Sequence, residues 1–206
     1  MNRVELKEKA KQSLQGKYKE TILMFLIFFG VNFAAGFGIG FLGALLNLSE
    51  NTINLFADVA SIVLSGLLTF GYMSYFLKLS RDEEVTKDEL FAKTDLLVPY
   101  IVLSVLIALF TSLWTLLLII PGIIAAINYS QAYYIVLDNP ELKPMEAISK
   151  SKEMMNGHKM DYFILNLSFL GWIIAGIFTL GILYFWLIPY MNVTNANFYN
   201  YLKEQA

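Results

Sequence analysis

The residues that could do chemistry in this chain are few. Its 206 residues include no Cys and a single His, His158. Disulfides, thiolate metal sites and cysteine nucleophiles are therefore excluded, and so is a zinc site built from several histidines. A Ser–His–Asp triad would depend on His158, which lies beside Lys159 in a charged segment. We expect a protein that is not an enzyme, with no catalytic residue, no metal site and no cofactor.

Polar side chains inside apolar stretches are the candidates for ligand binding. Asn128, Tyr129 and Gln131 belong to one polar and aromatic run, and Asp58 is a lone acid at the end of another apolar stretch. Within a membrane, such groups either line a cavity that water reaches or form hydrogen bonds between helices. Both interpretations stay open, and bonding between helices is the commoner one. The sequence predicts a candidate polar cavity at Asn128, Tyr129, Gln131 and Asp58.

The glycines favour helix packing over nucleotide binding. Gly36, Gly38, Gly40 and Gly43 resemble a phosphate loop in composition, but they lie in an uncharged apolar stretch with no strand before them. Small residues four positions apart let two membrane helices approach closely. The residues expected at helix contacts are Gly36, Gly40, Ala44, Pro121, Gly122, Gly171, Trp172, Pro189 and Tyr190.

The elements that carry these residues are membrane spans. Hydrophobic residues make up 57% of the chain and charged residues 16%, too apolar a balance for a soluble domain of this size or for a disordered chain. Uncharged stretches cover 21–49, 59–77, 96–137 and 162–202, and each of the last two is long enough for two spans. The predicted fold is one all-α membrane domain over residues 1–206, a bundle of six transmembrane helices arranged as three hairpins. The predicted spans are 21–46, 57–77, 96–113, 116–137, 162–178 and 181–201.

Two turns inside the long stretches follow from the same lengths. We expect the first near Thr111–Thr115, because a turn at Pro121-Gly122 would leave the second span only about 15 residues before Asp138. Pro121 then lies early in a helix, where its missing N–H is tolerated. The second turn is expected near Thr179–Gly181.

The cations predict the orientation. In the six-span arrangement, all fifteen Lys and Arg residues fall on one side of the membrane, and only Glu50 and Asp58 lie near the other face. Positive charge marks the cytoplasmic side, so both termini are expected in the cytoplasm. The charged segments before the hairpins show apolar residues at helical spacing, and we expect them to be cytoplasmic interfacial helices with lysines toward anionic lipids.

The first and third units also match at an offset of 141 residues. A parallel repeat and chance similarity in a biased composition both stay open. The matching residues are Lys9, Lys11, Gly16, Leu26, Phe28, Gly30, Ala34 and Gly40, which correspond to Lys150, Lys152, Gly157, Leu167, Phe169, Gly171, Ala175 and Gly181.

These patterns resemble an uncharacterised family of integral membrane proteins, mostly from Gram-positive bacteria, known as domain-of-unknown-function family nine-seven-five. A fainter similarity points to the membrane domain attached to some glycerophosphodiester phosphodiesterases, without their soluble catalytic domain. The resemblance implies a polytopic module of the bacterial cytoplasmic membrane and supplies no reaction. The stretches that carry it are Leu14 with Gly16-Lys17, Leu118–Ile124, Met154–Lys159, Leu167–Trp172 and Trp186–Tyr190, followed by Thr194, Ala196 and Phe198-Tyr199.

The expected function is accordingly broad. We expect a non-enzymatic protein of the cell envelope with an accessory or protective role, whose partners are membrane lipids and a transporter or another envelope protein. The alternative is a small carrier or export subunit for a lipid or amphiphile. The chain has no strongly basic domain for nucleic acid.

Overall fold

The computed structural model describes residues 2–86, 88–89 and 92–205, without the side chains of residues 62, 63, 65 and 67. The described chain is helical and contains no strand. The helices are α1 (Arg3–Leu14), α2 (Tyr18–Leu45), α3 (Glu50–Ser80), α4 (Leu97–Leu117), α5 (Ile119–Tyr129), α6 (Ala132–Asp138), α7 (Pro144–Met154), α8 (Lys159–Leu167), α9 (Leu170–Phe178) and α10 (Tyr184–Lys203), with a 3-10 turn at Thr94–Leu96.

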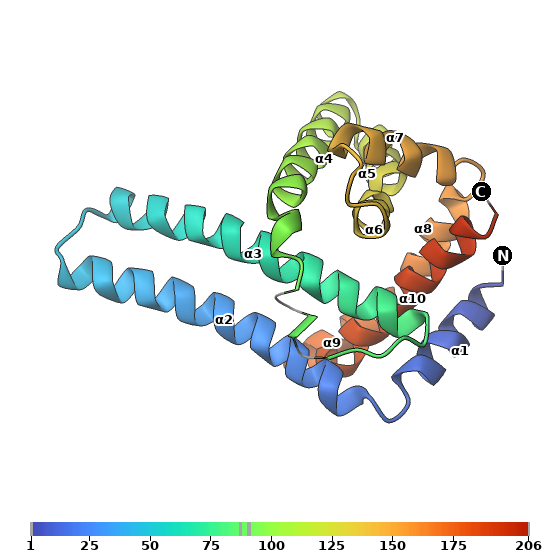
Figure 1. The fold of residues 1–206 in the computed structure, drawn as a ribbon, viewed down its shortest axis with the longest axis horizontal. Coiled ribbons are helices and arrows are strands. Elements are labelled where there is room, and N and C mark those ends of the chain that lie inside the picture. The colour runs from blue at the N-terminus through green and yellow to red at the C-terminus, as the bar shows by residue number, and fades with distance from the viewer. Residues whose placement is uncertain (1, 87, 90–91, 206) are drawn as a thin grey trace.

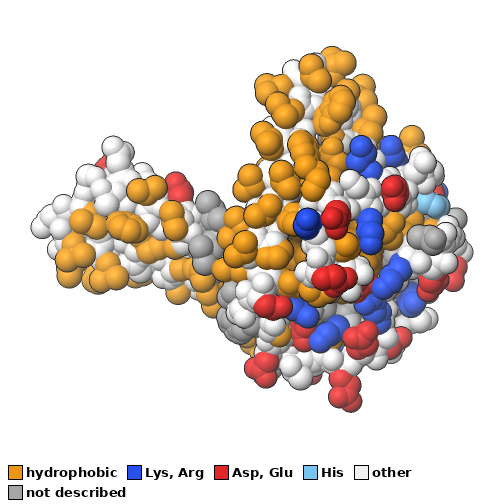
Figure 2. Space-filling model, turned by 45° about the horizontal axis from the view of Figure 1, so that its top comes forward, with side chains coloured by type: hydrophobic (Ala, Val, Ile, Leu, Met, Phe, Trp, Pro, Cys, Tyr) orange, Lys and Arg blue, Asp and Glu red, His pale blue; other side chains and the backbone are white. Residues whose placement is uncertain are grey.

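Apolar and charged surfaces separate in space. In Figure 1, α2 and α3 project from the body as one antiparallel pair, α4 and α5 project in another direction, and both termini lie on the body. In Figure 2, most charged side chains gather on the body, whereas hydrophobic side chains cover the upper projection and lie in patches along the projection on the left. Four helical segments within the described residues are long and apolar enough to cross a membrane, namely Tyr18–Leu45, Thr94–Leu117, Ile119–Asp138 and Lys159–Phe178. The chain therefore has the features of a membrane protein.

The α2–α3 pair, which we call the arm, is shaped by its turn and by an aromatic face. The Ser49 hydroxyl accepts a hydrogen bond from the Thr52 N–H and so caps the first turn of α3. A row of phenylalanines at every fourth position runs along α2, with ring centroids 6.3–6.5 Å apart. Phe33 and Phe37 are about two-thirds exposed, so this row faces the surroundings of the chain. Its members are Phe25, Phe29, Phe33, Phe37 and Phe41.

The turn expected at Thr111–Thr115 lies elsewhere. Helix α4 continues to Leu117, and Leu118 takes an extended conformation (φ −161°, ψ 146°) between α4 and α5. The Thr115 hydroxyl donates to the carbonyl of Thr111 one turn earlier, so this polar side chain is satisfied inside the helix and does not break it. Pro121 is the third residue of α5, where a proline is tolerated. The other turn, between α9 and α10, lies at 179–183, as expected.

The leading helices α1 and α7 bury their apolar residues in the protein. Helix α1 packs on α3 and α10, with Leu6, Ala10 and Leu14 buried. Helix α7 packs on α4, α5 and α6, with Ala147 and Ile148 buried. The expectation that these apolar faces lie against the lipid interface is therefore wrong, because neighbouring helices already cover them.

The two leading helices begin structurally matching units. Gly16 (φ 78°) follows α1, and Gly157 (φ 83°) follows α7, each in the left-handed region that glycine adopts most easily. Lys17 and His158 then have nearly the same backbone angles, and α2 and α8 begin directly after them. All these positions differ by 141 residues, which supports the repeat over helix, glycine turn and helix start. The units diverge later, where α8 ends at Leu167 and α2 continues to Leu45.

The predicted packing residues divide into two groups. A Cβ added at Gly36, Gly40 or Gly171 would meet nothing within 4 Å, and Ala44 and Trp172 are exposed. Among the described residues, these five show no close helix contact, contrary to the expectation. On α2 the close approach to α3 is made instead by Gly43, against Ile53. In the other group, Gly122 approaches the backbone of Thr115, Pro189 is buried within α10, and Tyr190 packs edge-on against Phe169.

A matched pair of glycine substitutions tests this assignment. A Cβ at Gly122 would lie 2.9 Å from the Thr115 Cα, closer than van der Waals contact allows. We expect Gly122→Ala to lower the stability by about 1–3 kcal/mol, the usual cost of overpacking. Gly40→Ala should leave it unchanged or raise it, since alanine favours helix and nothing is near. The measurement is thermal unfolding in detergent, and equal effects of the two substitutions would contradict the packing described here.

Candidate functional site

The polar run at residues 128–131 lies where α5 ends and α6 begins, against α7. The Ser151 hydroxyl of α7 donates to the Asn128 carbonyl at 2.6 Å and accepts from the Gln131 N–H at 3.2 Å. It thus satisfies backbone groups that the break between the two helices leaves free. The Gln131 side chain is fully buried, and the Tyr129 ring packs in the core beside Phe110. In this structure the run ties three helices together.

Two side-chain oxygens in this run accept no hydrogen bond from the described residues. The Oδ1 of Asn128 and the Oε1 of Gln131 are buried and have no hydrogen-bond partner among the described residues. The Gln131 Nε2 donates to the Ser130 hydroxyl at 2.8 Å. Unpaired buried acceptors are costly unless water or a ligand reaches them, so the candidate cavity at Asn128, Tyr129 and Gln131 stays a prediction.

Asp58 belongs to a different place. It lies on α3 in the arm and lines a hollow of about 310 Å³ between α2 and α3. Asn32, Gly36 and Ser61 line the same hollow. The structure therefore does not bring Asp58 together with Asn128 and Gln131, which lie at the contact of α5 and α6 with α7.

A cluster of polar side chains joins the ends of three helices. The Arg81 guanidinium, directly after α3, donates to both carboxylate oxygens of Asp138 at the end of α6, each at 2.8 Å. Lys203 at the end of α10 donates to the same carboxylate at 2.7 Å, and the Tyr199 hydroxyl does so at 3.0 Å. Asn200 accepts from Arg81 and donates to Ser80. We call Arg81, Asp138, Tyr199 and Lys203 the three-helix cluster.

Electrostatics explains the composition of this cluster. An acid at the C-terminus of a helix is disfavoured by the helix dipole, whereas a cation there is favoured. Asp138 occupies the unfavourable position, and its side chain is only 9% exposed, so it needs the two cations. Hydrogen bonding to Asp138 in turn raises the pKa of Arg81, which keeps this guanidinium charged. Sequence reasoning missed the cluster, although Asp138 and Lys203 are each the first charged residue after a long apolar stretch.

A second buried acid ties the segment after α3 back to that helix. Glu89 accepts a hydrogen bond from the Ser74 hydroxyl at 2.8 Å and another from the Lys78 amine at 2.9 Å. Burial alone would raise the pKa of Glu89, but these two bonds and the nearby positive charges lower it below its usual value. Glu89 therefore remains ionised and paired at neutral pH.

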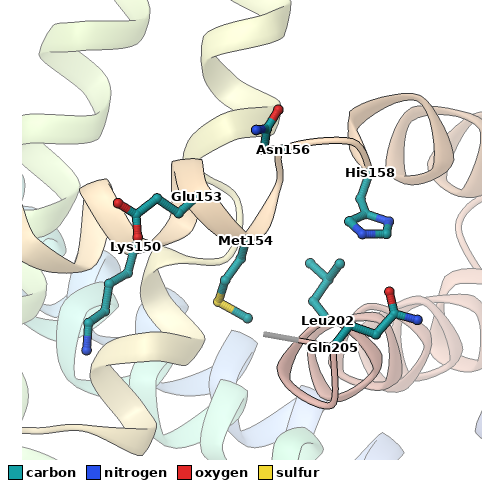
Figure 3. A pocket seen from close by; sticks show the side chains of 7 residues that line it. All are labelled: Lys150, Glu153, Met154, Asn156, His158, Leu202 and Gln205. Carbon is teal, nitrogen blue, oxygen red and sulfur yellow. The ribbon is translucent and has the colours of Figure 1, made fainter.

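A further hollow of about 500 Å³ lies beside His158 on the body, between α7, the start of α8 and the end of α10. In Figure 3, the His158 ring lies near Leu202 and Gln205, whereas Lys150 and Glu153 extend on the opposite side of the hollow. His158 Nδ1 is 3.7 Å from the Asp161 carboxylate, and its ring packs edge-on against Tyr201. Acid–base or nucleophilic catalysis requires polar groups that converge on one point. The polar groups around this hollow do not converge in this way. Within the described residues, no three acidic or histidine side chains gather as a metal site would require.

Comparison with known proteins adds the family. Residues 1–125 and 115–206 match the family model described as "Protein of unknown function (DUF975)". The chain belongs to this family. No curated protein and no solved structure matches the chain.

The three-helix cluster can be tested by neutralising its acid. Asp138→Asn keeps the shape of the side chain and removes the charge that Arg81 and Lys203 share. Breaking a buried ion pair costs about 3–5 kcal/mol and an exposed one under about 1. Because Arg81 and Lys203 are partly exposed, we expect a loss of about 2 kcal/mol, measured by thermal unfolding in detergent.

The matched control for this test is Glu8→Gln. Glu8 and Lys11 form an exposed pair at 3.8 Å on α1, and removing it should change the melting temperature by no measurable amount. Equal stability of Asp138→Asn and the unmodified chain would show that the cluster does not hold the helix ends.

Proposed function

We propose that the chain is a non-enzymatic, multi-pass protein of the bacterial cytoplasmic membrane, with an accessory or protective role in the cell envelope. In this proposal the membrane is crossed six times, by α2, α3, α4, α5–α6, α8–α9 and α10, and both termini are cytoplasmic. The hydrogen bonds of buried polar side chains are the observation that best supports this proposal. Asp138, Glu89 and Ser151 each bond to groups on other segments of the chain, and a residue engaged in this way holds helices together.

The exposed apolar surface indicates the partners. Phe25, at one end of the phenylalanine row of α2, packs edge-on against Phe185 of α10. The other members, Phe29, Phe33, Phe37 and Phe41, are each about 60% exposed or more. Acyl chains cover such a face in a bilayer, and so would a helix of a transporter or another envelope protein. Lipids and one membrane-embedded protein partner are therefore part of the proposal, and nucleic acid is not.

The topology is tested first, because the role depends on it. The unmodified chain contains no Cys, so single cysteines at Asn51, Glu84 and Lys150 report their own positions. We expect an impermeant thiol reagent to label Asn51→Cys on intact cells and to label the other two only after lysis, because cations mark the cytoplasmic side. Labelling of positions 84 or 150 on intact cells, without labelling of position 51, would reverse the proposed orientation.

A carrier for a lipid or amphiphile is the second candidate function. The observation that favours it is the hollow beside Asp58, a polar site between two helices that are otherwise apolar. The unpaired acceptors of Asn128 and Gln131 also offer binding capacity to a carrier.

Replacing both Asn128 and Gln131 by Leu separates the two functions at this place. A deletion strain should be more sensitive to membrane-active compounds than its parent, and the unmodified chain should restore resistance. If the two side chains serve only packing within the protein, the double variant loses the Gln131–Ser130 side-chain bond and keeps the backbone bonds to Ser151. It then melts at a slightly lower temperature, by roughly 0.6 kcal/mol for the one bond lost, and still restores resistance. We expect that result, because Gln131 is fully buried. A stable double variant without activity would favour the carrier, and a deletion strain of unchanged sensitivity would reject the protective role.

A further inference from the structure

The arm contains a carboxylate, Asp58, for which the described part of the chain supplies no cation. No Lys, Arg or His occurs between Lys19 and Lys78, and Asp58 makes no ion pair with any described residue. A carboxylate at the edge of the hydrocarbon is costly unless water, a proton or a cation compensates it. Asp58 is exposed, so a cation from outside the described chain can reach it.

The distance along α3 from Asp58 to Lys78 matches the thickness of the hydrocarbon core. Twenty residues separate it from Lys78, the first cation at the other end of the helix. At 1.5 Å per residue this is about 30 Å, the thickness of the hydrocarbon core. If Lys78 lies at the inner boundary, Asp58 lies at the outer boundary, level with the headgroups of the outer leaflet.

The hollow beside Asp58 is of a size for a headgroup. Its volume is about 310 Å³, and small residues make up much of its wall, namely Ala35, Gly36, Ala57 and Ala60. Two further polar side chains face it, Asn32 from α2 and Ser61 from α3. The Asn32 amide nitrogen donates to the Phe28 carbonyl at 2.8 Å, which leaves its oxygen as an acceptor. Acceptors around a carboxylate suit a donor cation, and a primary ammonium offers three N–H donors.

We propose that the Asp58 hollow binds the primary ammonium headgroup of an outer-leaflet lipid, with Asp58 as the ion-pair partner and Asn32 as an additional acceptor. The inference rests on the second candidate function, the amphiphile carrier, and on the proposed topology. It names the class of amphiphile and the residues that recognise it. The acyl chains then lie along the exposed apolar surface of the arm.

The test compares two lipids that differ only at the head. The purified chain in detergent is mixed with phosphatidylethanolamine or phosphatidylcholine of identical acyl chains, and retained lipid is counted by native mass spectrometry. The choline head carries a positive charge but no N–H donor. We expect about tenfold stronger retention of the amine lipid, the effect of one charge-assisted contact. Equal retention of the two lipids would overturn the proposal.

Three variants locate the site. Asp58→Asn should abolish the preference, whereas Glu50→Gln, at the other carboxylate of the outer end, should retain it. Gly36→Leu places a bulky side chain in the hollow and leaves Asp58 unchanged. No described atom lies within 4 Å of a Cβ there, so this variant should fold and lose the preference too. A preference that survives in Asp58→Asn, or that disappears equally in Glu50→Gln, would overturn the proposal.

Lipid binding at the Asp58 hollow and lipid transport by the chain are measured separately, so one proposal can be rejected without the other. A selective site in a chain that moves no fluorescent amine lipid between the leaflets of vesicles would support the site and reject the carrier. Lipid movement that does not depend on Asp58 would reject this site as the route and leave the carrier function standing.

Discussion

Asp138 stands at the C-terminus of α6, where the helix dipole disfavours a negative charge and where little water reaches it. Its carboxylate is stable there because Arg81 and Lys203 approach it from the ends of two other helices. The requirement is mutual, since each of those cations gains a buried partner. The result fixes the relative positions of α3, α6 and α10 on the body, and the rest of the architecture is arranged around these three helix ends.

The leading segments follow from that arrangement. Helix α1 covers α10 and α3, the segment with Glu89 is bonded to α3, and α7 covers α4, α5 and α6. Each leading segment thus buries apolar or pairing residues against at least one helix whose end meets the three-helix cluster, and for α7 this helix is α6. The same sequence of helix and glycine turn occurs at α1 with Gly16 and at α7 with Gly157.

Away from the body, the chain has few internal contacts. The arm is held by the close approach of Gly43 to Ile53 and by the capped turn at Ser49, and much of its surface is apolar and exposed. Such a surface is stable only in a bilayer or against another membrane helix. The proposed lipid site and the proposed protein partner both depend on this exposed part, whereas the body supplies the rigid base.

The sequence by itself determined the helical class, the membrane character and the separation of charged from apolar surface, because composition and uncharged length depend on residue types alone. It also predicted the turn after α9. It could not locate the turn after α4, since Thr115 either breaks a helix or bonds within it, and the choice depends on the approach of Gly122. It could not separate Gly43 from Gly36 and Gly40, because spacing does not show which glycine closely approaches a neighbouring helix. The pairing of Arg81, Asp138 and Lys203 joins residues far apart in the chain, and only the tertiary structure decides which distant charges meet.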